Sequence, residues 1–280
     1  MEMRPACVAL DLDGTTLRTG GVLSAYTKDV LEELGARGVN IIVASGRSFT
    51  SLPGEVLALE GVEYAVCSNG ASVWHVPTGR CIHRTVLPPD AAEDVLVAMT
   101  GENVHFECFV EGKPYADAFY VADPVACGAL PRAIPYIQST RQPVEDIAGF
   151  IRAHAQELEN LDVIVADQSR KAVLWETLAG LRDDLYVTSS VHQLLEIAHR
   201  DAGKQTGLSF VLDRLGLTAA QTVAFGDADN DLDMLRWAGL GVAVGNAPAE
   251  VQAAADRIAP TNDEDGVAKV LAELFAVEAS

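Results

Sequence analysis

Two aspartates, Asp11 and Asp13, directly follow a run of small apolar residues near the start of the chain. The run 6–10 is continuously apolar rather than alternating, which predicts a strand buried on both faces of a parallel sheet. Ligands bind such sheets outside the carboxyl ends of the strands, where both carboxylates would lie. Because two carboxylates one residue apart repel each other, one keeps its proton unless a cation shares the site. The pair therefore offers a nucleophile or a metal ligand beside a general acid.

The residues after Asp13 favour a turn that binds an anion. Gly14 lets the backbone turn, and the amides and hydroxyls of Thr15 and Thr16 are suited to line an anion pocket. Taken alone, an Asp-x-Asp-Gly sequence is more simply explained as a solvated turn after an ordinary strand. Residues elsewhere in the chain must decide between the two interpretations.

A second acidic cluster, more than two hundred residues later, favours chemistry. Asp227 ends another buried apolar run, and Asp231 lies one helical turn beyond it. Carboxylates gathered at neighbouring strand ends would destabilise the fold without a hard divalent cation, and oxygen-only ligation suits Mg²⁺. Asp229 and Asp233 would point away from the helix face shared by Asp227 and Asp231, and we expect them to be solvated. Acidic residues that merely favour a helix N-terminus would explain the second cluster alone, but not the two together.

The segments around the first cluster alternate between strand and helix patterns. Strands are predicted at 39–44 and 64–67, and helices at 24–37 and 56–59. This order is typical of parallel βαβ units. The two later strands end in Ser45-Gly46-Arg47 and Ser68-Asn69-Gly70-Ala71, so we expect Asp11, Ser45 and Asn69 along one edge of the sheet.

The pattern changes near Thr85, where a hairpin is predicted from 105–110 and 114–116. Helical patterns at 91–99, 144–158 and 169–181 alternate with strand-like runs at 161–166, 185–189 and 194–198. The first pattern then returns with a helix from Lys204 to 215, strands at 222–225 and 241–244, a helix at 251–255, a short strand near Ile258 and a helix at 267–275. We therefore expect an α/β fold: a Rossmann-like parallel-sheet core with helices on both faces, formed by 1–84 and 197–280, and an inserted α+β cap domain at 85–196.

Composition narrows the class of protein. The 280 residues include 49% hydrophobic and 21% charged residues, typical of a folded globular chain. The net charge of -20 argues against a nucleic-acid partner. Five scattered cysteines without a Cys-x-x-Cys spacing indicate reduced thiols. The chain contains no run of eighteen apolar residues, so no membrane span is predicted. We expect a cytoplasmic protein with no membrane partner.

The ordered set DxDGT…SGR…K…GDxxND resembles the haloacid dehalogenase superfamily of phosphohydrolases, in its Cof-type branch with a large cap between the second and third motifs. The four motifs occur in family order and cover essentially the whole chain. The resemblance extends to Asn69-Gly70-Ala71, to Leu195-Glu196-Ile197 and to the stretch 262–267. It implies a Mg²⁺-dependent phosphatase that acts on a small phosphorylated metabolite, such as a sugar phosphate.

The resemblance implies a role for each matching residue. Asp11 would attack the phosphoester and become an aspartyl phosphate, while Asp13 would act as general acid and then general base. Ser45 would bind the phosphoryl oxygens and Lys204 would neutralise their charge. The metal ligands would be the Asp11 and Asp227 carboxylates and the backbone carbonyl of Asp13, and Asp231 would lie behind these ligands. The implied phosphate or substrate contacts are Thr15, Ser45, Gly46, Arg47, Asn69, Lys204 and Asn230.

Two alternatives remain open. One is a phosphomutase or a specialised sugar-phosphate phosphatase of the same superfamily, and the other is a catalytically silent binding or regulatory module with the same fold. The sequence does not identify the substrate, because no motif marks the cap. It ranks none of four cap residues that are available to an anionic or sugar group: Arg132, Arg170, Lys171 and His192. The oligomeric state is equally open.

Overall fold

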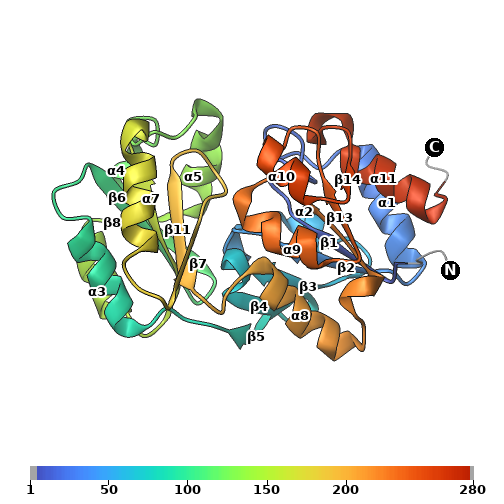
Figure 1. Cartoon of the computed structure of the whole chain (residues 1–280), viewed down its shortest axis with the longest axis horizontal. Coiled ribbons are helices and arrows are strands. Elements are labelled where there is room, and N and C mark those ends of the chain that lie inside the picture. The colour runs from blue at the N-terminus through green and yellow to red at the C-terminus, as the bar shows by residue number, and fades with distance from the viewer. Residues whose placement is uncertain (1–4, 278–280) are drawn as a thin grey trace. The chain divides into compact units, whose positions relative to one another are not determined.

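The computed structural model describes residues 5–277, which form two compact units (Figure 1). The first unit comprises the described residues up to Gly46, Leu52–His83 and those from Gly203 onward. The second comprises Arg84–Ala202 and also the short segment Arg47–Ser51. The sequence pattern did not separate this short segment from the strands and helices around it.

The first unit is built on a sheet with the strand order β14-β13-β12-β1-β2-β3-β4-β5. Its strands are β1 (Cys7–Leu10), β2 (Asn40–Ala44), β3 (Val62–Cys67), β4 (Ser72–His75), β5 (Arg80–Arg84), β12 (Thr222–Gly226), β13 (Leu240–Ala243) and β14 (Arg257–Ile258). Strand β1 is central and pairs in parallel with β12 and β2, so that Leu10 lies opposite both Phe225 and Val43. Strand β4 runs antiparallel to β3. The sequence had predicted neither β4 nor β5.

Helices pack on this sheet through apolar side chains. The helices of the first unit are α1 (Ala25–Ala36), α2 (Gly54–Leu57), α8 (Lys204–Leu215), α9 (Leu232–Trp237), α10 (Ala249–Ala254) and α11 (Gly266–Phe275). Helices α8, α9 and α10 cover the face that carries Ala9 and Ile42, whereas Val8 and Leu10 point to the opposite face by strand alternation. Helix α1 packs against α11 and against β2 (Figure 1). Short 3₁₀ helices complete the unit: η2 (Ser68–Gly70), η3 (Val76–Thr78), η6 (Ala219–Gln221), η7 (Asp229–Asp231) and η8 (Asn262–Glu264).

The second unit contains a mixed sheet with the strand order β10-β11-β9-β6-β7-β8. Its strands are β6 (Val104–Val110), β7 (Lys113–Asp117), β8 (Gln142–Val144), β9 (Leu158–Val165), β10 (Leu185–Thr188) and β11 (Leu194–His199). Its helices are α3 (Pro89–Ala98), α4 (Ala118–Ala122), α5 (Ile134–Thr140), α6 (Ile147–Ala153) and α7 (Lys171–Ala179), with η1 (Phe49–Ser51), η4 (Pro131–Ala133) and η5 (Gln168–Arg170). The predicted hairpin is present, because β6 and β7 pair antiparallel. The helix predicted at 144–158 is shorter, since β8 ends at Val144 and β9 already begins at Leu158.

One face of the second sheet carries a row of buried acidic side chains. The strand register places Glu107 and Glu196 opposite Asp162, one on each side. All three side chains are buried, and Arg141 forms an ion pair of 2.8 Å with Glu107. Burial, followed by the nearby carboxylates, raises the pKa of Asp162 well above its usual range. The sequence analysis did not anticipate this row.

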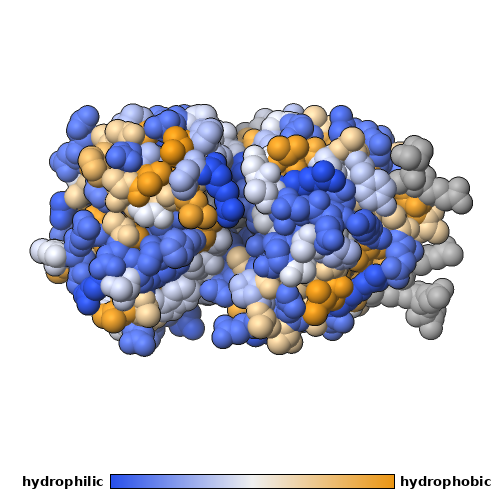
Figure 2. Space-filling view, turned by 90° about the horizontal axis from the view of Figure 1, so that it is seen from above, coloured by the Kyte–Doolittle hydropathy of each residue, from blue (hydrophilic) through white to orange (hydrophobic). Residues whose placement is uncertain are grey.

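The surface is mostly polar on the face drawn in Figure 2, with hydrophobic residues in small groups between hydrophilic ones. Within residues 5–277 the helices are too short or too polar to cross a lipid bilayer. All five cysteines are free thiols, and four of them are buried.

Candidate active site

Four of the predicted residues lie at the carboxyl ends of adjacent strands. Strands β12, β1, β2 and β3 are neighbours and parallel. Asp227, Asp11, Ser45 and Asn69 follow these strands, so they lie at the same edge of the sheet. The last two are joined directly, since the backbone N–H of Asn69 donates to the carbonyl oxygen of Ser45 at 3.2 Å.

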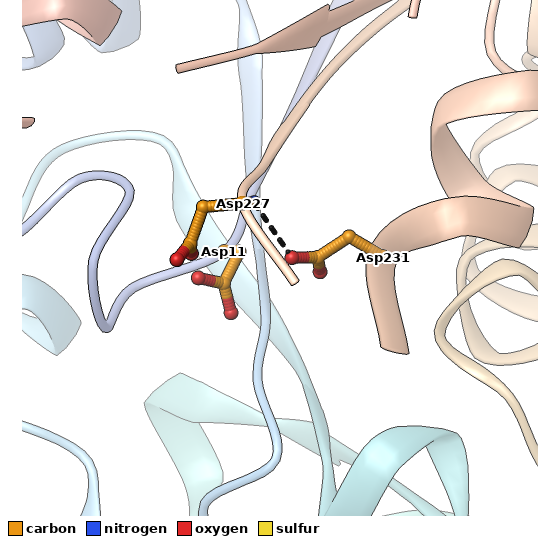
Figure 3. Close-up of side chains that lie close together, drawn as sticks. All are labelled: Asp11, Asp227 and Asp231. Carbon is orange, nitrogen blue, oxygen red and sulfur yellow. Dashed lines mark hydrogen bonds between the residues drawn. The ribbon is translucent and has the colours of Figure 1, made fainter. Parts of the chain in front are cut away.

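Asp11, Asp227 and Asp231 come together at this edge (Figure 3). One carboxylate oxygen from each lies within 4.8 Å of the others. The Asp231 carboxylate comes from the end of η7 and turns back toward β12, where its Oδ2 accepts hydrogen bonds from the backbone N–H groups of Asp227 at 2.9 Å and Ala228 at 3.0 Å. The four-residue spacing of Asp227 and Asp231 thus closes a small ring that fixes both side chains. Oxygen donors of this kind can hold a metal ion.

Lys204 is the cation of this cluster. It opens α8, it is buried, and its Nζ donates to Asp11 Oδ1 and to Asp231 Oδ1 at 2.6 Å each. Despite its burial, the two carboxylates raise the pKa of the ammonium above its ordinary value, so it stays charged. Lys204 therefore fixes the position of the Asp11 carboxylate and neutralises part of its charge.

The charges in the cluster do not balance without a further cation. Three carboxylates face one ammonium, which leaves two negative charges when all are ionised. Burial raises the pKa of Asp11 well above its usual range. Lys204 lowers this pKa, whereas the charges of Asp231 and Asp227 raise it further. Burial and the Asp231 charge also raise the pKa of Asp227 to about 7. A hard divalent cation would compensate this excess, and the all-oxygen donor set matches what such an ion prefers.

The loop after β1 packs closely on Asp227. Thr15 Oγ1 donates to Asp227 Oδ1 at 2.6 Å, and Thr16 Oγ1 donates to the carbonyl oxygen of Asp11 at 2.6 Å. Both hydroxyls are thus engaged as donors within the protein rather than facing an open anion pocket. Gly14 has φ of +78°, and a Cβ at this position would lie 2.6 Å from Asp227 Oδ2. Glycine is needed here both for the turn and for this close approach.

Other predicted residues divide between contacts near the cluster and contacts elsewhere. Asn230 donates from Nδ2 to Asn69 Oδ1 at 2.9 Å, which connects the fourth predicted motif to the Asn69-Gly70-Ala71 turn across the strand edge. Asp13 is exposed, as is Asp233. Asp229, which we expected to be solvated, is half-buried.

Arg47 lies in the second unit. Its Nη1 donates to the carbonyl oxygen of Ser51 at 3.0 Å, and its guanidinium stacks 4.3 Å from the ring centroid of Tyr136. Two of the cap residues considered from sequence also have partners inside this unit. Arg170 pairs with Glu102 at 2.6 Å, and Lys171 donates to Ser189 Oγ at 2.8 Å and to the neighbouring backbone carbonyls.

Comparison with known proteins places these features in a family. Residues 8–271 match the model of the haloacid dehalogenase-like hydrolases. The chain is 30% identical to the 5-amino-6-(5-phospho-D-ribitylamino)uracil phosphatase YitU of Bacillus subtilis over 99% of this chain and 100% of the relative. It is 28% identical to phosphatase YwpJ of the same organism, over 96% and 99% of the two chains. A solved haloacid dehalogenase-like hydrolase from B. subtilis superimposes with a TM-score of 0.80 at 26% identity, covering 95% of this chain and 98% of the other.

The match therefore covers both units, including the insertion between Ser45 and Lys204, and it covers the acidic cluster at the strand ends. The chain belongs to the haloacid dehalogenase-like hydrolases, as a phosphatase of the Cof type.

Proposed function

We propose that this chain is a Mg²⁺-dependent phosphatase that hydrolyses a small phosphorylated metabolite, a sugar phosphate or a similar phosphomonoester, through an aspartyl phosphate on Asp11. The observation that carries the proposal is the buried Asp11 carboxylate, held by Lys204 beside the carboxylates of Asp227 and Asp231. The relative YitU is named for a phosphorylated ribityl compound, which agrees with a small phosphomonoester as substrate.

The first step forms a bond between a carboxylate oxygen of Asp11 and the phosphorus and breaks the bond from phosphorus to the ester oxygen. That ester oxygen leaves with a proton from Asp13, which is exposed and thus accessible to substrate. In the second step Asp13 takes a proton from the attacking water, the acyl phosphate bond breaks, and inorganic phosphate leaves. Asp11 and Asp13 return to their starting protonation states, so the cycle closes.

The remaining residues bind charge and hold geometry. Lys204 keeps one Asp11 oxygen in place and offsets the negative charge of the phosphoryl group. Ser45, with its buried side chain at the end of β2, would hydrogen-bond the phosphoryl oxygens. Asn230 is buried and its Oδ1 has no hydrogen-bond partner among residues 5–277, so an enclosed water would be its partner.

Asp11 and Asp227 would hold Mg²⁺ together with the backbone carbonyl of Asp13, and Asp231 would support them from behind. Both oxygens of Asp231 already accept N–H donors, from Lys204 and from two backbone amides, which favours a supporting position. When bound, the ion would withdraw charge from the phosphoryl oxygens and lower the repulsion between substrate and carboxylates.

The second unit would select the substrate, since all residues with a proposed role in bond making lie in the first unit. The polar side chains of the insertion are candidates for contacts with the part of the substrate that does not react. Contacts of this kind assist the reaction only for substrates large enough to make them.

The test is phosphate release from a panel of phosphorylated metabolites, with and without Mg²⁺, on the wild type and on two variants. Asp11→Asn should form no covalent intermediate and release no phosphate from any substrate. Asp13→Asn should slow both steps by ~10²–10⁴-fold, and an aryl phosphate with a good leaving group should partly restore its first step. Equal rescue of both variants, or full activity after exhaustive chelation of metal, would overturn the assignment.

A further inference from the structure

The loop that carries the proposed acid, Asp13, is formed by turns and isolated bridges and contains neither a helix nor a strand. Backbone N–H groups of Thr15, Thr16 and Leu17 all converge on the carbonyl oxygen of Leu12, at 2.8 to 3.3 Å. Further along, the loop forms two isolated bridges, Asp13 with Leu17 and Arg18 with Val22, and a turn in which the Gly21 N–H donates to the Arg18 carbonyl at 2.9 Å. Gly20 and Gly21 both have positive φ and nothing packed against them. Thr15 and Thr16 hold the middle of this loop to Asp227 and Asp11, and contacts from elsewhere in the chain hold its other residues.

Side chains from two distant segments provide that support. We call Asn246, Asn262, Asp263 and Asp265 the C-terminal clamp. Asn246 Nδ2 donates to the carbonyl oxygen of Gly14 at 2.8 Å, and Asn262 Nδ2 donates to the carbonyl oxygen of Leu17 at 2.9 Å. The two asparagines are themselves joined, since the backbone N–H of Asn262 donates to Asn246 Oδ1 at 2.9 Å.

The two aspartates of the clamp hold the outer part of the loop. Asp263 accepts from the backbone N–H and the hydroxyl of Thr19 at 2.7 and 2.8 Å. Asp265 accepts from Arg18 Nε at 2.9 Å and from its Nη2 at 2.5 Å. These contacts are exposed or partly exposed, so water competes for them and each contributes little by itself.

The asparagine contacts are placed where they constrain Asp13 directly. Gly14, held by Asn246, is the next residue in the chain, and Leu17, held by Asn262, is the bridge partner of Asp13. The two contacts thus act on residues that adjoin Asp13, one in sequence and one across the bridge. The Asn262 contact is buried, so its loss would remove a hydrogen bond from the Leu17 carbonyl at a position shielded from solvent.

We propose that Asn262 and Asn246 are positioning residues for Asp13: their amides hold the carbonyl groups of Leu17, its bridge partner, and Gly14, its neighbour in sequence, and so keep its carboxylate at the geometry needed for proton transfer. The inference rests on the proposed role of Asp13 as general acid and base. Asn246 and Asn262 would thus assist proton transfer although neither belongs to the cluster of Asp11, Asp227, Asp231 and Lys204.

The experiment measures how kcat/KM depends on the leaving group, across a series from alkyl phosphates to p-nitrophenyl phosphate. Asn262→Asp keeps the shape of the side chain but removes the donor. A displaced Asp13 should lower kcat/KM by roughly 10- to 100-fold for alkyl phosphates, as a small misplacement of a catalytic group does. The loss should be far smaller for p-nitrophenyl phosphate, whose leaving group needs no proton. Asn246→Ala, at an exposed position where the fold tolerates a substitution more easily, should change the dependence of kcat/KM on the leaving group in the same direction.

Asn40→Asp is the matched control, because Asn40 Nδ2 also donates to a backbone carbonyl, that of Ala6 at 3.2 Å, at the opposite end of β2. It should lower thermal stability without altering the leaving-group dependence. If both clamp variants lose activity equally on all substrates while Asp13→Asn shows the steep dependence, the positioning role is wrong and the proposed function stands. If Asp13→Asn itself shows no such dependence, the proposed role of Asp13 fails instead.

Discussion

Gly70 and Gly203 touch backbone to backbone: a Cβ atom on Gly70 would lie 2.0 Å from the carbonyl oxygen of Gly203. Gly70 belongs to η2, directly after Asn69, and Gly203 directly precedes Lys204 at the start of α8. This contact fixes the start of α8 against the end of β3. It thereby sets the position from which Lys204 reaches Asp11 and Asp231.

We predict that Gly70→Ala destabilises the protein by about 2 kcal/mol or more, since it adds both a backbone collision and an unfavourable φ of +92°. It should also lower kcat/KM, because α8 can relieve the collision only by moving Lys204. Gly79→Ala is the control, since Gly79 also has a positive φ but has nothing within 4 Å of its added Cβ. Urea unfolding and steady-state kinetics should show a smaller loss of stability for Gly79→Ala and no loss of activity. Equal effects of the two variants would rule out the contact as the cause.

The buried ion pairs of Lys204 lead to a second prediction. Lys204→Met should destabilise the fold by about 3–5 kcal/mol, because it leaves two buried carboxylates without their cation. Adding Asp231→Asn to Lys204→Met should recover part of this loss, because one of the two unpaired charges is removed. Activity should remain lost in both. Lys269→Met, an exposed position on α11, should leave the unfolding free energy nearly unchanged. A double variant no more stable than the single one would contradict the charge argument.

Metal binding can be tested without measuring activity. In the wild type, Mg²⁺ at about one hundred times its dissociation constant should raise the unfolding free energy by about 2.7 kcal/mol. Asp227→Asn should be more stable than the wild type in the absence of metal, because burial and the Asp231 charge disfavour its ionised form. It should gain little from Mg²⁺, so the order of stability reverses when the ion is added. Thermal melts with and without Mg²⁺ measure this crossing.

Asp233→Asn serves as its control, since Asp233 is exposed and lies outside the cluster of Asp11, Asp227 and Asp231. Its response to Mg²⁺ should equal that of the wild type. A stabilisation of Asp227→Asn by Mg²⁺ as large as that of the wild type would mean that the ion binds elsewhere.

The sequence predicted which strand ends meet because the signal is local. A continuous apolar run followed by Asp11, Ser45, Asn69 or Asp227 marks the end of a buried parallel strand, and parallel strands end at a common edge. The start of α8 at Lys204 was predicted to the residue. The position of Lys204 between two carboxylates depends instead on how α8 packs on β3, which a pattern within one segment does not contain.

Two parts of the fold escaped the sequence analysis for different reasons. Strand β4 is only four residues long and follows the left-handed turn at Asn69, so it has too few residues to show a period. The acid row of the second unit escaped because Glu107 and Asp162 alternate with apolar neighbours, a pattern that normally predicts a solvent-facing strand side. Helices α4 and α5 pack on that side of the sheet and bury it.

This acid row gives the last prediction, a dependence of stability on pH. Burial and the carboxylates of Glu196 and Glu107 raise the pKa of Asp162, so the folded protein keeps a proton there that the unfolded chain releases near its ordinary pKa of about 4. Stability from this group is therefore present at acid pH and is lost as pH rises toward the raised pKa. Each unit of that shift corresponds to about 1.4 kcal/mol.

Asp162→Asn removes the ionisable group while keeping an oxygen for the hydrogen bond from Asn160. It should raise the melting temperature at pH 8 and flatten its decline between pH 5 and pH 8. Asp167→Asn is the control of opposite sign, because hydrogen bonds from Ser169 lower the pKa of that exposed carboxylate, so its contribution is lost only toward acid pH. A decline between pH 5 and pH 8 that survives Asp162→Asn unchanged would show that another group carries the proton.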